Sequence, residues 1–131
     1  MQKGLTLIEV LIAAAVLIVS CSLVFLLFTN CIILNESNRN LTLAVSHAQY
    51  ILEEIKNTNF SSIKTSIDGG TWDWTIATLS GHELTALTNE EITTSEAGTD
   101  PDLLNITVTV NWQDRGGRNR TITMQTLMAE L

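Results

Sequence analysis

The stretch that decides the fold reads KGLTLIEV over residues 3–10, and an apolar run follows it as far as residue 28. The run from residue 10 to residue 28 contains no charged residue and no proline. As a helix it would be about 28 Å long, because each residue adds 1.5 Å, and this length is close to the hydrocarbon thickness of a bilayer. We therefore predict a membrane-spanning helix that begins within the quoted stretch.

The N-terminus can be interpreted in several ways. A secretory signal peptide could be cleaved after the small residues 13–15, but apolar sequence continues well beyond them. Residues 18–21 resemble a loose lipoprotein signal ending at Cys21, yet apolar rather than polar residues follow that cysteine. A generic anchor would have to tolerate Glu9, although a carboxylate near the bilayer centre costs about 2.5–3.5 kcal/mol and is usually functional.

A fourth interpretation explains Glu9. Residues 4–10 (GLTLIEV) resemble the processing and methylation signature of type IV prepilins and type II secretion pseudopilins. The resemblance implies that a membrane peptidase cleaves between Gly4 and Leu5 and methylates the new N-terminus. It also implies that Glu9 pairs with the N-terminal amine of a neighbouring subunit during filament assembly. Lys3 would keep the leader in the cytoplasm by the positive-inside rule.

The helix is expected to continue beyond the membrane, because residues 5–68 contain neither glycine nor proline. We predict one helix over residues 5–57. An apolar stripe with a period near 3.5 marks its second half, and Ala44 and Ile51 widen that stripe. The stripe consists of Leu41, Val45, Ala48, Leu52 and Ile55. His47 is expected to lie off this stripe.

Strand patterns follow the helix. Residues 71–76 alternate so that Trp72, Trp74 and Ile76 share one face, and residues 106–112 alternate more clearly. Residues 113–118, with two glycines, indicate a turn, and residues 120–128 return as a strand with Ile122 and Met124 inward. Leu84 and Leu87 could form a short strand, whereas residues 93–102 are interpreted as a loop. All three tryptophans, including Trp112, are expected in the core.

The fold class is therefore α+β, with an antiparallel sheet of three or four strands packed on the second half of a long helix. This arrangement is also what the resemblance to the type IV pilin fold implies. The expected organisation is a leader over residues 1–4, a transmembrane segment over 5–34 and a soluble domain over 35–131. Within that domain, residues 35–57 complete the helix and residues 71–128 form the sheet and its loops.

Charge limits the choice of partners. The net charge is −7, and the acidic residues from 83 to 102 are expected to be solvated. Such a chain is a poor partner for nucleic acid. Arg115, Arg118 and Arg120 form the one basic cluster, which we consider as a ligand contact on an exposed turn.

No pattern typical of an enzyme, a cofactor site or a metal site is present. The chain lacks nucleophile-elbow, Walker and dinucleotide-binding motifs, and neither His47 nor His82 has further ligands at metal-binding spacing. Asp100 and Asp102 could contribute to a calcium site in a loop, but calcium requires about six to eight oxygen ligands. Cys21 and Cys31 would be about 15 Å apart on one helix, too far for a disulfide.

The resemblance implies a structural role. The chain has no helix-loosening glycine or proline in its membrane half and no cysteine beyond residue 31. In these two respects it resembles a minor pilin or minor pseudopilin, a subunit that initiates or caps a filament. The alternative is a binding module at the filament tip for DNA, surfaces or a secreted protein. Implied partners are other pilin subunits, the prepilin peptidase and methyltransferase, the inner-membrane assembly platform and membrane lipid. The chain would cross the cytoplasmic membrane once, with its N-terminus cytoplasmic and its C-terminal domain extracytoplasmic.

Overall fold

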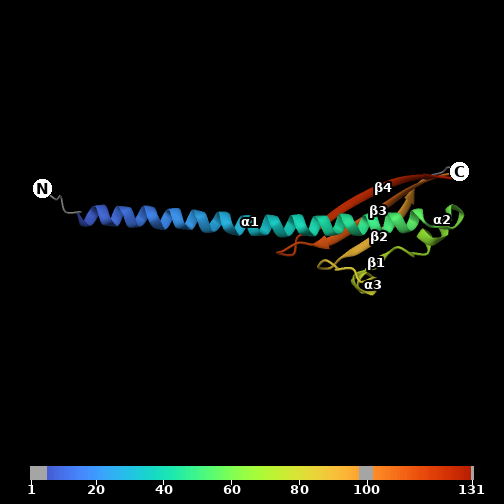
Figure 1. Ribbon diagram of the computed structural model, residues 1–131, viewed down its shortest axis with the longest axis horizontal. Coiled ribbons are helices and arrows are strands. Elements are labelled where there is room, and N and C mark those ends of the chain that lie inside the picture. Colours follow the sequence, from blue (N-terminus) through green and yellow to red (C-terminus); the bar gives the residue numbers. More distant parts are fainter. Residues whose placement is uncertain (1–5, 98–101, 131) are drawn as a thin grey trace. The chain divides into compact units, whose positions relative to one another are not determined.

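The computed structural model describes residues 6–97 and 102–130 of the chain. The predicted α+β class is confirmed, and one long helix precedes a four-stranded antiparallel sheet. The elements in chain order are α1 (Leu7–Lys56), α2 (Phe60–Asp68), β1 (Trp74–Thr75), α3 (Ile76–Gly81), β2 (Glu91–Ala97), β3 (Leu103–Gln113) and β4 (Asn119–Ala129) (Figure 1). Gly4, Leu5 and Asp100, which the sequence analysis singled out, lie outside the described residues.

The chain divides into two compact units, Met1–Glu36 and Ser37–Leu131. In the first unit, every described residue as far as Ile32 is exposed. An 18-residue window of α1 reaches a mean hydropathy of 3.0, so this helix is long and apolar enough to cross a membrane. Nothing within the described part of the first unit covers these apolar side chains.

The second unit contains the sheet, in the order β1-β2-β3-β4 with every neighbouring pair antiparallel. Even-numbered residues of β3, such as Ile106 and Val108, are buried on the inner face of the sheet. They belong to one core cluster with the buried residues of α1, and Figure 1 shows strands alongside that part of the helix. Ile122 and Met124 of β4 are half-buried against this core, so their inward orientation is confirmed.

The predicted apolar stripe of α1 is largely confirmed, because Ala44, Ala48, Ile51, Leu52 and Ile55 are all buried. One edge of it differs: Leu41 is 44% exposed and Val45 is only half-buried, whereas His47 is buried. The prediction for His47 was wrong because the sheet covers the face that runs through Ala44 and Ile51, and that face includes residue 47.

Residues 93–102 were predicted as a loop, but β2 occupies Glu91–Ala97. This strand pairs with β3 from Glu91 opposite Asn111 to Ala97 opposite Asn105. Its sequence is mostly polar because only Ile92 is fully buried, while the odd-numbered positions are exposed. Pairing with a long neighbouring strand, rather than an apolar alternation of its own, therefore makes this segment a strand.

The predicted strand over residues 71–76 shrinks to β1, the two residues Trp74 and Thr75. Thr75 is the N-cap of α3, so Ile76 begins a helix and is 42% exposed instead of sharing a face with the tryptophans. Trp72, Trp74 and Trp112 are all buried in the core cluster, as predicted. Helix α2 was not predicted; the Asn59 side chain caps it by accepting a hydrogen bond from the Ser61 backbone N–H at 3.2 Å.

The turn between β3 and β4 was predicted correctly. Gly116 and Gly117 have φ angles of 92° and 76°, which lie in the left-handed region that favours glycine. The two strands are in register from Leu103 opposite Ala129 to Gln113 opposite Asn119. This hairpin contains the two longest strands of the sheet.

Candidate functional site

Glu9 lies in the first turn of α1, and its carboxylate is held by Thr6. Oε2 of Glu9 accepts a hydrogen bond from the Thr6 backbone N–H at 2.9 Å and another from the Thr6 hydroxyl at 2.8 Å. The Thr6 carbonyl in turn accepts hydrogen bonds from the backbone N–H groups of Glu9 and Val10. Thr6 therefore occupies the N-cap position and Glu9 the third position of the helix.

This arrangement is half of a capping box, in which a glutamate at the third helical position reaches back to the N-cap backbone N–H. A negative charge in the first turn also interacts favourably with the helix dipole. The isolated subunit thus gives the Glu9 carboxylate two internal hydrogen bonds before any other molecule is present. The part played by Thr6 was not predicted, although the spacing Thr-x-x-Glu before an apolar run indicates a capping box.

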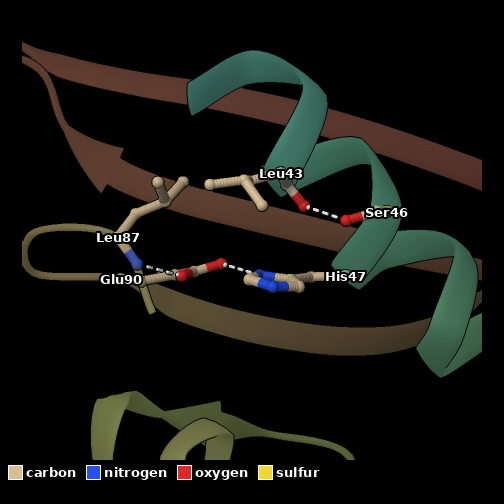
Figure 2. A network of polar contacts seen from close by, with 5 residues as sticks. All are labelled: Leu43, Ser46, His47, Leu87 and Glu90. Carbon is tan, nitrogen blue, oxygen red and sulfur yellow. Dashed lines mark hydrogen bonds and ion pairs between the residues drawn. The ribbon is translucent and has the colours of Figure 1, made fainter. Parts of the chain in front are cut away.

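A second polar cluster lies inside the core of the second unit. Nδ1 of His47 is 2.7 Å from Oε1 of Glu90, and the two side chains are 3% and 0% exposed. Oε2 of Glu90 accepts a hydrogen bond from the Leu87 backbone N–H at 2.6 Å. Figure 2 shows His47 on α1 pointing towards the carboxylate of Glu90. The pair ties α1 to the turn that precedes β2.

Glu90 was expected among solvated acidic residues, and that prediction was wrong. Because Glu91 is exposed at the start of β2, its neighbour Glu90 points to the opposite side, into the core. The spacing of His47, three residues after Ala44 and four before Ile51, could have placed this histidine on the buried stripe. A partner 43 residues away in the sequence carries no local signal.

The three arginines of the predicted ligand contact flank the β3–β4 turn around Asp114. This aspartate is 5% exposed, and its Oδ2 lies 3.4 Å from Nη2 of Arg120 and 3.7 Å from Nη2 of Arg118. Its Oδ1 accepts a hydrogen bond from the Arg115 backbone N–H at 2.8 Å. Part of the positive charge expected to face a ligand is therefore directed at a carboxylate of the same hairpin.

Within residues 6–97 and 102–130, no group of three or more histidine, cysteine, aspartate or glutamate side chains could hold a metal ion. The suggested calcium contact at Asp100 falls outside these ranges, so that suggestion stays untested. Cys21 and Cys31 are both free and exposed.

A comparison with known protein families identifies the N-terminal element. The family model described as "Prokaryotic N-terminal methylation motif" matches residues 1–25, which include the capped helix start and much of the apolar run. This motif is the one that marks type IV pilin-like prepilin proteins. Searches of curated proteins and of solved structures found no match to the chain.

The matched motif bears on the first unit of the chain. The matched family is defined by a structural motif and not by an enzymatic activity. The exposed apolar part of α1 and the motif fit a membrane-anchored pilin-like precursor that assembles with other pilin subunits. Glu9, at the start of that anchor, is the one carboxylate among the described residues of the apolar segment 6–34.

Proposed function

We propose that this pilin-like protein is a minor subunit of a type IV pilus or of a type II secretion pseudopilus. In this proposal the prepilin peptidase removes residues 1–4, and the new N-terminus at Leu5 is methylated. Residues 5–34 cross the cytoplasmic membrane, and residues 35–131 form the extracytoplasmic domain. The protein then helps to initiate or cap the filament by joining other pilin subunits through α1.

The position of Glu9 carries this proposal. A carboxylate at the edge of the apolar segment is costly without a partner, so it gains most from a partner that offers a positive charge. The N-terminal amine of a neighbouring processed subunit is such a partner in a place where water cannot replace it. In the isolated subunit Thr6 supplies two hydrogen bonds to Oε2, but it supplies no charge. Thr6 therefore holds the carboxylate in place until a cation is available.

The experiment replaces Glu9 in the native host and separates processing from assembly. Glu9→Ala and Glu9→Gln should be processed normally, which intact mass would show as loss of residues 1–4 and gain of one methyl group. Both variants should fail to crosslink to other pilin subunits, because neither retains the negative charge. Glu9→Asp should be intermediate, since its shorter side chain reaches less far.

A matched control is Glu53→Gln, which removes an exposed carboxylate from the second half of the same helix. This variant should be processed and should crosslink like the unaltered protein. Normal crosslinking of both Glu9→Ala and Glu9→Gln would contradict assembly by charge pairing. An N-terminus beyond residue 13, or a lipid on Cys21, would contradict the proposed processing.

A further inference from the structure

A polar depression lies at one end of the outer face of the sheet, the face turned away from the core. Its volume is about 330 Å³, within the range of about 300–1,000 Å³ that is typical of small-molecule sites. The strand register brings Glu91, Asn111 and Thr121 into one row across three strands, with Gln113 opposite Asn119 beside it. Besides the buried Trp112, the lining residues are Asn89, Glu91, Asn111, Gln113, Asn119 and Thr121.

Hydrogen bonds between these side chains organise the depression. The Asn89 amide donates to Oε1 of Gln113 at 2.7 Å, and the Gln113 amide donates to Oδ1 of Asn119 at 3.3 Å. The Thr121 hydroxyl donates to Oδ1 of Asn111 at 2.7 Å. A primary amide has two N–H donors and two acceptor lone pairs, so each of these amides can make further hydrogen bonds to a ligand. The lining thus offers several donors and acceptors at fixed positions.

The charge of the outer face restricts the ligand. Glu91 is the one charged side chain among the described residues of β2, β3 and β4 that alternate onto this face. An anionic ligand would therefore meet a carboxylate and no cation among the lining residues. A metal cation would find only one carboxylate, Glu91, among lining residues that are otherwise neutral, which is a weak ligand set for a hard cation. The class of ligand that remains is neutral and rich in hydrogen-bonding groups.

We propose that this depression binds a neutral saccharide unit. Each sugar hydroxyl is both a donor and an acceptor, which matches amides that offer both functions. Adjacent hydroxyls can donate to the two oxygens of Glu91, and its neighbours Asn111 and Thr121 lie in the same row. The proposal adds a ligand to the second unit and goes beyond the assembly function of the first.

The buried pair His47–Glu90 supports the depression from beneath. Glu90 points into the core, while Asn89 and Glu91 on either side of it line the depression. Asn89 has a φ angle of 51°, a left-handed conformation that asparagine adopts more readily than most residues. The Gln113 backbone N–H also donates to the Thr88 carbonyl at 2.8 Å, which fixes the same turn to the end of β3. These contacts hold the lining in place before a ligand arrives.

The test uses the full chain in a phosphocholine detergent, because the head groups of maltoside and glucoside detergents are themselves sugars. The neutral probes are glucose, galactose and N-acetylglucosamine, and glucuronic acid and glucosamine serve as charged comparisons. At least one neutral sugar should shift the side-chain amide resonances of Asn89, Asn111 and Gln113 in a saturable way. We expect a dissociation constant of about 1 mM, as for a small ligand held by few contacts.

Variants then separate a binding site from a general surface effect. Asn111→Ala and Gln113→Ala should each weaken binding at least about tenfold, because the amides they remove would leave sugar hydroxyls unpaired. The matched control is Asn105→Ala, on the same strand and face but outside the depression, and it should bind normally. Circular dichroism of each variant would confirm that the fold is retained.

Three outcomes would overturn the proposal. One is the absence of any shift with the neutral sugars at about 100 mM, a hundred times the expected dissociation constant. Another is binding of glucosamine alone that Glu91→Gln abolishes, which would make the depression a cation site. The last is equal weakening by Asn105→Ala and Asn111→Ala, which would show that the sugar contacts the sheet without a defined site.

Discussion

Helix α1 has two parts that differ in how far they expose the same type of side chain. Ile18 in the first unit is 64% exposed, whereas Ile51 in the second unit is 0% exposed. Burying an isoleucine side chain is worth about 1.5–3 kcal/mol relative to leaving it in water. The sheet supplies that burial to Ile51, and no described part of the chain supplies it to Ile18. The contrast teaches that this helix needs a second environment, which for a pilin-like anchor is lipid and neighbouring subunits.

The largest expected effect sharpens that contrast. Trp112→Ala should lower the free energy of unfolding of the second unit by about 3–5 kcal/mol, because Trp112 is 5% exposed in the core. Phe25→Ala removes an aromatic side chain that is 74% exposed in the first unit and should leave that free energy unchanged. Urea unfolding of the detergent-solubilised chain, followed by circular dichroism, would measure both. Equal losses would break the distinction between the two parts of the helix.

The next effect concerns the buried pair that links α1 to the sheet. Glu90→Ala should cost about 3 kcal/mol, because it leaves both His47 and the Leu87 backbone N–H buried without a partner. Glu91→Ala, one residue away and exposed, should stay within about 0.5 kcal/mol. The same unfolding experiment applies. If His47→Ala and Glu90→Ala were additive in the double variant, the two side chains would not be coupled.

A smaller effect is expected at the start of α1. Thr6→Ala should destabilise the first helical turn by about 1 kcal/mol, because the N-cap hydroxyl no longer donates to Glu9. Amide hydrogen exchange at residues 9 and 10 should accelerate accordingly. Thr42→Ala is the control, since the Thr42 hydroxyl bonds the Asn38 carbonyl within the helix and caps nothing. Unchanged exchange in Thr6→Ala would mean that the hydroxyl does not stabilise this turn.

The smallest effect lies at an exposed ion pair of the second unit. The hydrogen bond from Lys64 to Glu96 raises the pKa of Lys64 above its ordinary value of 10.5. A raised pKa means that the folded state holds the proton more tightly than the unfolded state, so the pair stabilises the fold at neutral pH. That contribution is lost as the pH rises through the raised pKa. Lys64→Met should therefore be slightly less stable at pH 7 and should match the unaltered protein above that pKa; a constant difference would contradict the assignment.

The elements with a strong local pattern were predictable from the sequence. The anchor, the absence of a break in α1 and the hairpin of β3 and β4 follow from apolar length, from missing glycine and proline, and from alternation around two glycines. Strand β2 was missed because its sequence is mostly polar and shows no apolar alternation. It forms a strand because it pairs along its length with β3. Helix α3 was missed because the alternation of residues 71–76 ends at Thr75, the N-cap position of that helix.

The candidate functional residues also divide into those that the sequence could identify and those that it could not. The motif around Glu9 is contiguous, so its residues could be identified from the sequence, and Thr6 could have been added from its spacing. The pair of His47 and Glu90 joins residues 43 positions apart, and no local pattern connects them. The basic cluster was found by composition, but its partner Asp114 became apparent only once the hairpin was folded.

What the sequence determined by itself is a prepilin-type methylation motif, an apolar helix long enough to cross a membrane, and a helix followed by a sheet. Consecutive residues suffice for this. The length of the apolar run can be compared with the thickness of a bilayer, and a carboxylate beside that run is unusual because it is costly in lipid. Only the tertiary structure decided that His47 and Glu90 are internal, and that amides from the turn before β2, from β3 and from β4 meet in one depression. These features depend on strand register and on packing between distant segments, and a local pattern does not contain that information.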